Sequence, residues 1–100
     1  MQLVELSKAL ANDSRMDIMR WLRSPEEHFR PHKDGKDFSD GVCASLISEK
    51  AEMSQSTVSH YLSVLRHADL VIPTRIGKWT YYKRNDATIR TYLSELQLTL

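Results

Sequence analysis

The chain has 100 residues, 41% of them hydrophobic and 27% charged, with a formal net charge of +1. This length and composition are typical of a single globular domain over residues 1–100. No apolar run approaches the ~20 residues that a membrane-spanning helix needs, and the first residues lack the basic flank and apolar centre of a signal peptide. The single cysteine, Cys43, excludes an intrachain disulfide. We therefore expect a cytoplasmic protein with no membrane partner.

The charge is unevenly distributed along the chain. Residues 60–84 contain five basic side chains and one acidic side chain, whereas residues 25–52 contain seven acidic and four basic ones. A net charge near zero argues against nucleic-acid binding, but a local basic segment can supply the attraction to phosphate. If the chain binds DNA, we expect its acidic segment to face away from the DNA.

Two helices are expected at the start of the chain. Leucines recur on one helical stripe over residues 2–11: Leu3, Leu6 and Leu10. A second helix is expected over residues 14–23, with Asp13 or Ser14 as its N-cap. It should end before Pro25, because proline disfavours helical geometry in the preceding residue.

Residues 24–41 show no regular periodicity. They are rich in charge, proline and glycine, and their two aromatic residues are Phe29 and Phe38. An irregular segment of this length is uncommon in a compact domain. We expect a loop that contains, at most, a short extended piece near Phe38.

Residues 42–68 predict two helices joined by a short turn. The first spans residues 42–51, and Ser54 would cap the second, which runs to about residue 68. The second helix has an apolar face at helical spacing: Val58, Tyr61, Leu62, Leu65 and Ala68. Small polar groups and histidines gather on the opposite face.

A hairpin and a final helix follow. Residues 70–75 and 79–83 have strand-like composition, and residues 76–78 supply the glycine of a turn. Pro73 suits an edge strand. Asn85 or Asp86 would cap a helix that runs to about residue 98 and carries an apolar stripe: Ile89, Tyr92, Leu93, Leu96 and Leu100. The predicted fold is mainly α, with four helices, a small antiparallel β-hairpin and a fifth helix.

A helix with a polar face followed by a basic hairpin is typical of a DNA-binding protein. The second helix of a helix-turn-helix lies in the major groove with its N-terminal residues near the base edges. Gln can pair bidentately with adenine, and Ser or Thr can bond bases or phosphates. The predicted contacts on the recognition helix, residues 55–68, are Gln55, Ser56, Thr57, Ser59, His60 and Ser63. The alternative is an ordinary helix with a solvated polar face.

The hairpin, residues 71–84, would act as a basic wing. Arg75 and Lys78 at its turn are predicted to contact the DNA backbone or the minor groove, with further basic residues at its base: Lys83 and Arg84. Its aromatic residues are expected to pack in the core and on the sheet rather than to stack on bases: Trp79, Tyr81 and Tyr82.

Several separated motifs, in this order, resemble the ArsR family of winged helix-turn-helix transcriptional repressors. They are residues 8–15 (KALANDSR), 54–62 (SQSTVSHYL), 70–71 (LV) and 77–82 (GKWTYY). The resemblance covers nearly the whole chain apart from residues 24–41. It implies a homodimer held by the first and last helices, and repression that is relieved by a ligand or chemical signal.

The residue pattern also favours a homodimer, since the apolar stripes of the first and last helices are hard to cover within one chain of this length. The predicted interface residues are Leu3, Leu6, Leu10, Ile89, Tyr92, Leu93 and Leu96. A two-fold dimer would place two recognition helices about 34 Å apart, one turn of DNA. The predicted partner is therefore double-stranded DNA with a palindromic operator.

The metal ligands that the resemblance implies are incomplete. A Cys-x-Cys pair would fall on Cys43 and Ser45, and an Asp-x-His pair on Asp86 and Thr88. One thiolate is a poor basis for a soft-metal site, so we predict no metal cofactor.

Two alternatives for sensing involve the only cysteine. His28, His32 and Cys43, with a nearby carboxylate, form a chemically reasonable zinc set. Cys43 could instead be a redox sensor if its thiolate is accessible. Helical periodicity opposes both, because it places Cys43 beside Leu46 and Ile47 on an apolar face.

The sequence contains no Gly-rich phosphate loop, no H-E-x-x-H and no nucleophile elbow, so we do not expect an enzyme. The predicted function is sequence-specific DNA binding by a dimeric transcriptional repressor. The alternative is a winged-helix module that binds protein and has no specific DNA affinity.

Overall fold

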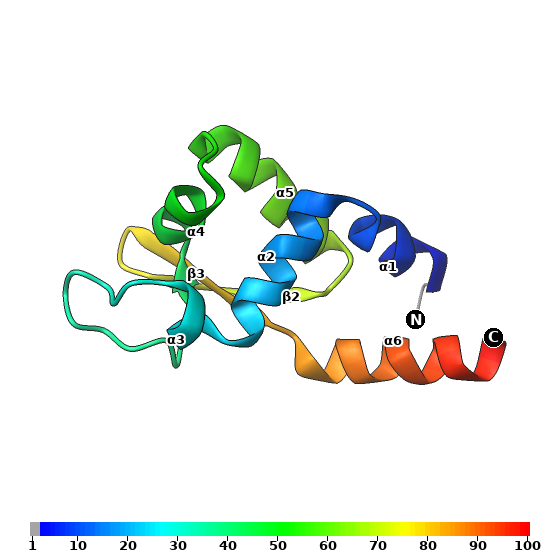
Figure 1. The fold of residues 1–100 in the computed structure, drawn as a ribbon. Coiled ribbons are helices and arrows are strands. Elements are labelled where there is room, and N and C mark those ends of the chain that lie inside the picture. Colours follow the sequence, from blue (N-terminus) through cyan, green and yellow to red (C-terminus); the bar gives the residue numbers. More distant parts are fainter. Residues whose placement is uncertain (1–2) are drawn as a thin grey trace.

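The computed structural model describes residues 3–100, which form six helices and three strands (Figure 1). In chain order they are α1 (Leu3–Leu10), α2 (Asp13–Arg23), α3 (Pro25–His28), β1 (Val42–Cys43), α4 (Ala44–Ala51), α5 (Gln55–His67), β2 (Val71–Ile76), β3 (Trp79–Arg84) and α6 (Asp86–Thr99). The prediction of a mainly α fold with a small antiparallel sheet is confirmed. The predicted start of the first helix, at residue 2, lies outside the described residues.

The start of α2 differs from the prediction by one residue. Asn12 is the N-cap, with extended backbone angles and a side-chain Oδ1 that accepts a hydrogen bond from the Arg15 N–H at 3.0 Å. Asp13 is already helical, where its carboxylate complements the positive end of the helix dipole. The choice of Asp13 or Ser14 as the cap was therefore wrong, because asparagine caps equally well and comes first.

The segment over residues 24–41 contains one regular element that the sequence did not predict, the short helix α3, with Pro25 at its first position. The expected extended piece near Phe38 is absent from this segment. Phe38 instead packs by its ring against Phe29 and His32, at centroid distances of 6.4 and 4.9 Å. The strand lies further along, in β1.

The sheet has three strands rather than the two predicted, in the order β1-β3-β2 and antiparallel throughout. Val42 and Cys43 pair with Tyr82 and Tyr81, so the helix expected over residues 42–51 begins only at Ala44. Gly41 permits this pairing. It has φ +109°, and a Cβ at this position would lie 2.5 Å from the Tyr82 carbonyl.

The wing is formed by β2 and β3. Ile76 pairs with Trp79, so the turn is the two residues Gly77 and Lys78, one fewer than predicted. Gly77 has φ +61°, which suits the first position of a type II′ turn. Pro73 lies on the edge strand β2, as predicted.

The helix-turn-helix is formed by α4 and α5. Glu52 ends α4 in the left-handed conformation, at φ 55°. Ser54 then caps α5, with its Oγ accepting from the Thr57 N–H at 3.2 Å, as predicted. At the other end of the domain Asn85 caps α6 through a hydrogen bond from the Thr88 N–H, which confirms one of the two predicted caps.

One hydrophobic core joins the helices to the sheet. Val58, Leu62 and Leu65 of α5 are fully buried, whereas Tyr61 and Ala68, predicted on the same face, are half-buried at its edge. Figure 1 shows α2 between α5 and α6, so these two helices lie on opposite sides of the domain. Within residues 3–100, every helix is too short or too polar to cross a lipid bilayer.

Candidate nucleic-acid interface

The outward face of α5 is polar and open to solvent. All six predicted recognition residues are exposed: Gln55, Ser56, Thr57, Ser59, His60 and Ser63. They lie opposite the buried stripe because the apolar residues follow a 3.6-residue period. No acidic side chain occurs between residues 53 and 68, so this face offers hydrogen-bonding groups without negative charge.

The first turn of α5 holds its hydroxyl groups in place. The Ser54 Oγ donates to the Thr57 Oγ1 at 2.9 Å, which leaves the proton of Thr57 free to be donated outward. The Ser56 Oγ lies 3.2 Å from the same Ser54 oxygen. The N-terminal backbone N–H groups add positive potential here. This turn therefore presents several oriented donors to an external acceptor.

The wing tip carries two cations. The Arg75 Nε donates to the Gly77 carbonyl at 2.9 Å, which holds the guanidinium at the turn. The Lys78 Nζ lies 5.6 Å from the centre of the Trp79 ring. Both cations are exposed, so their charges are available to an anionic partner.

The base of the wing contributes less than predicted. Arg84 is half-buried, and its Nε lies 3.6 Å from an Asp86 oxygen. This pairing directs Arg84 toward the start of α6, so it was wrong to count Arg84 as an available cation. Lys83 remains exposed. The aromatics are split between the core and the sheet surface, as predicted: Tyr81 is buried, whereas Trp79 on β3 is 51% exposed.

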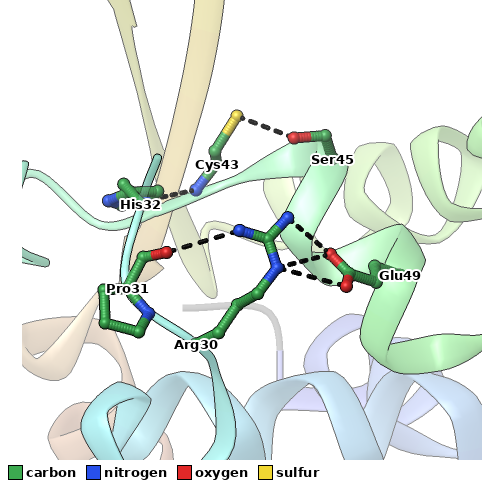
Figure 2. Close-up of polar contacts among 6 residues, drawn as sticks. All are labelled: Arg30, Pro31, His32, Cys43, Ser45 and Glu49. Carbon is green, nitrogen blue, oxygen red and sulfur yellow. Dashed lines mark hydrogen bonds and ion pairs between the residues drawn. The ribbon is translucent and has the colours of Figure 1, made fainter. Parts of the chain in front are cut away.

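The acidic segment does not wholly face away from α5. Asp34 and Glu49 line the same cavity as Gln55, so two of its carboxylates lie near the start of α5. Arg30 offsets the charge of Glu49 through hydrogen bonds of 2.9 to 3.2 Å, drawn in Figure 2. The same bonds lower the pKa of Glu49 and raise the pKa of Arg30 relative to their ordinary values. The loop is thus tied to α4 beside the recognition helix.

The predicted dimer residues divide into three groups. Leu6 and Tyr92 are already buried within the protomer, where the Tyr92 hydroxyl lies 2.8 Å from the Ser7 Oγ. Four are half-buried between the helices: Leu3, Leu10, Ile89 and Leu96. Leu93 is 56% exposed. Of the seven predicted interface residues, Leu93 alone is classed as exposed in the protomer.

Other apolar residues extend this surface. Val4, Leu98 and Leu100 are 65%, 85% and 96% exposed. Val4 and Leu100 also line a groove of about 330 Å³ between α1 and α6. The sequence placed Leu100 on the apolar stripe of the last helix. Val4 lies beside the leucine stripe of the first helix and was not predicted as an interface residue. We refer to three exposed apolar residues as the apolar face: Val4 of α1, Leu93 of α6 and Leu100 directly after α6.

The candidate zinc site is not formed. The Cys43 N–H donates to the His32 Nε2 at 3.2 Å, and the His32 Nδ1 lies 2.8 Å from the Lys36 carbonyl oxygen, so both ring nitrogens are occupied. Over the part of the chain that the structure describes, no three His, Cys, Asp or Glu side chains are grouped closely enough to hold a metal. His28 and Cys43 therefore do not join His32 in such a site.

Cys43 is a poor candidate for an accessible redox sensor. Its side chain is 8% exposed, and its Sγ lies 3.3 Å from the Ser45 Oγ (Figure 2). Oxidation requires a reachable thiolate. Burial therefore agrees with the apolar environment expected from the helical periodicity, although Cys43 precedes α4 instead of lying within it.

Comparison with known proteins decides the family. Residues 42–72, which run from β1 through α4 and α5 to the start of β2, match the family model described as bacterial regulatory protein, arsR family. The chain is 49% identical over 90 residues to an uncharacterized HTH-type transcriptional regulator, YbzH, of Bacillus subtilis, and the match covers 89% of each chain. It is 33% identical over 88 residues to the arsenical resistance operon repressor of the same organism, covering 88% of this chain and 70% of that repressor.

The chain belongs to the ArsR family. This ArsR-family chain is a transcriptional regulator with a winged helix-turn-helix DNA-binding domain. Its helix-turn-helix is α4 and α5, and its wing is β2 and β3.

Solved structures share the ArsR-family fold. One is the homodimeric winged helix-turn-helix DNA-binding domain of a possible ArsR-family regulator from Mycobacterium bovis, with a TM-score of 0.66 and 24% identity over 98% of this chain and 77% of that one. Another is HlyU from Vibrio cholerae, with a TM-score of 0.64 and 23% identity over 95% of this chain and 88% of that one. At these identities the likeness establishes the fold alone.

Proposed function

We propose that this ArsR-family regulator is a dimeric repressor that binds a palindromic operator. In this proposal α5 enters the major groove, with its six exposed polar residues facing the base edges and nearby phosphates. The observation that carries the proposal is the exposed, acid-free polar face of α5 together with the two exposed cations of the wing tip. This combination suits a partner that presents base edges between two rows of phosphate.

The side chains on α5 suggest a division of roles. Gln55 has the amide that pairs with adenine, and it lies in the first turn, the part of a recognition helix that reaches deepest into the groove. The hydroxyl of Thr57 is held by the capping bonds and suits a phosphate oxygen. Arg75 and Lys78 on the wing would bind the backbone or the minor groove regardless of sequence.

The second element of the proposal is a two-fold dimer through α1 and α6. The relative from Mycobacterium bovis is described as homodimeric. In this chain, the apolar face leaves large aliphatic side chains in water, which a second copy would cover. Such a dimer would place two α5 helices about one DNA turn apart and would therefore favour an inverted repeat.

Selection of binding sites from random duplexes tests the proposal directly. We expect an enriched inverted repeat with half-sites about 10 base pairs apart. If the dimer makes about eight phosphate contacts, the logarithm of its affinity should fall with the logarithm of salt concentration with a slope near −7. No enrichment, together with an affinity that is insensitive to salt, would instead favour a module that binds protein.

A further inference from the structure

A cavity of about 400 Å³ lies beside the recognition helix. Five parts of the fold contribute to it: the loop after α3, β1, α4, the start of α5 and the wing. Its lining side chains include Leu46, Tyr81 and Trp79, which offer apolar and aromatic surface. Gln55 also lines it and is the only one of the proposed DNA contacts in the lining.

The aromatic surface of the cavity suits a planar ring. Tyr81 is 4% exposed and is held by the His32 ring, which meets it edge-on at 5.4 Å between centroids. Trp79 is 51% exposed, so part of a large aromatic side chain remains in water. A flat aromatic ligand between these side chains would cover that surface and make offset or edge contacts.

Most polar groups on this side of the cavity already have partners within the chain. The guanidinium of Arg30 is held against the Glu49 carboxylate, as Figure 2 shows, so this pair is close to neutral. The His32 Nε2 accepts from the Cys43 N–H, and its Nδ1 lies 2.8 Å from the Lys36 carbonyl oxygen, so both ring nitrogens already have partners. Asp34 directs one oxygen to the Lys36 N–H of its own loop, at 3.0 Å.

Two basic side chains line the cavity, Arg30 and Lys33. Of these, Lys33 has no ion-pair partner among the described residues. Its ammonium group is exposed and free to move toward a ligand. A carboxylate on the ring could reach Lys33 without breaking the pair between Arg30 and Glu49.

We propose that this cavity binds a planar aromatic carboxylate, with the ring against Trp79 and Tyr81 and the carboxylate near Lys33, and that this ligand weakens DNA binding. The second part rests on the proposed function. The ligand would lie between Gln55 of the recognition helix and Trp79, which follows Lys78 in the wing. There its negative charge would approach the phosphates and its bulk would alter the spacing of the two DNA-binding elements.

Nuclear magnetic resonance of the intact chain tests ligand binding in the absence of DNA. The probe is 2-naphthoate, with 2-naphthamide as the neutral ring control and cyclohexanecarboxylate as the acid without an aromatic ring. We expect saturable shifts of the Trp79 indole N–H signal, whereas Trp21, which does not line the cavity, should not move and serves as an internal control. An unmoved Trp79 signal at millimolar 2-naphthoate would overturn the proposal.

The role of the carboxylate is tested by substitution. We expect 2-naphthoate to bind about fivefold more tightly than 2-naphthamide, the upper range for an exposed charge pair. Lys33→Ala should remove this difference. Lys50→Ala, which deletes the same charge from an exposed site outside the cavity lining, should preserve it. Equal affinities for the acid and the amide in the unsubstituted chain would refute the assigned ligand class.

The effect on DNA is measured after the operator affinity of the ligand-free protein is known. Saturating 2-naphthoate should weaken operator binding about fivefold or more, and operator DNA should weaken 2-naphthoate binding by the same factor, because coupling is reciprocal. An unchanged operator affinity at saturation would overturn the coupling. Failure of the ligand-free protein to bind any duplex would refute the proposed function instead, and the Trp79 titration would still decide the ligand site.

Discussion

Two exposed surfaces on opposite sides of this domain differ in chemistry. On α5 the exposed groups are a glutamine, hydroxyls and a histidine, and water can hydrogen-bond to each of them. On α1 and α6 the exposed groups include the aliphatic side chains of the apolar face, among them Leu93 at 56% and Leu100 at 96% exposure. Apolar area of this kind costs about 25 cal/mol per Å² while it stays in water.

Under the proposed function, this difference lets one small domain bind DNA through one surface and a second copy through the other. A hydrated polar face is stable alone and suits a hydrated, charged polymer. An apolar face is stable only when covered, and two-fold symmetry allows an identical surface to cover it. The following predictions test this contrast, beginning with the largest expected effect.

A charge on the apolar face should have the largest effect. Leu93→Glu would place a carboxylate in each copy of a two-fold interface, where it would lose its water. We expect dimer dissociation to become more than a hundredfold easier, a cost of roughly 3 kcal/mol or more. Analytical ultracentrifugation measures this change, and circular dichroism should show an intact fold because Leu93 is exposed in the protomer.

Ser94→Glu is the matched control for this prediction. Ser94 is exposed on the same helix and is the next residue along the chain, so it points away from the apolar stripe. The Ser94→Glu variant should leave the dimer intact. Equal dissociation by both variants, or by neither, would contradict the assignment of α6 to the interface.

On the polar face, Gln55→Ala should reduce affinity for the selected operator by roughly 1–3 kcal/mol and leave affinity for random DNA nearly unchanged. The reason is that a bidentate amide contact discriminates between bases. Fluorescence anisotropy with both duplexes measures the difference. Gln97→Ala, on α6, removes the same amide far from α5 and should change neither affinity. An equal loss on random DNA would mean that Gln55 contacts phosphate.

The wing cations should act without regard to sequence. Arg75→Ala or Lys78→Ala is expected to weaken binding to operator and random duplexes alike. Each lost phosphate contact should reduce the salt slope by about one unit, hence by about two for a dimer. Titrations at several salt concentrations measure this slope. Arg90→Ala, which removes an exposed arginine from α6, should leave the slope unchanged; a matching decrease would show a general charge effect.

The smallest expected effect concerns the turn that presents the polar face. Glu52 has φ 55°, which is costly for a residue with a Cβ. Glu52→Gly should therefore raise the free energy of unfolding by about 1 kcal/mol, measured by chemical denaturation. Glu52→Ala keeps the Cβ and should give no such gain. A gain from both variants would assign the effect to the lost charge.

Features that depend on neighbouring residues were predictable from the sequence. The cap at Ser54, the buried stripe of α5 and the glycine turn of the wing follow from local hydrogen bonding and from helical or strand periodicity. The same periodicity placed the six polar residues of α5 on the outside. Each of these features is set by residues only a few positions apart, so it can be predicted without knowledge of the rest of the fold.

Contacts between distant segments needed the tertiary structure. The pairing of Val42 with Tyr82 turns a predicted helical turn into a third strand, because Gly41 lets the chain approach β3. The burial of Tyr92 against α1 removes it from the exposed surface, since one helix can cover part of another within the protomer.

The sequence by itself determined the recognition helix, the basic wing turn and the family. Only the tertiary structure decided that the loop after α3 lies against α4 and the wing, where Arg30 meets Glu49 and the cavity beside Trp79 is formed. The physical reason is that these side chains are brought together by packing across 19 or more residues of chain, a distance over which composition and periodicity carry no information.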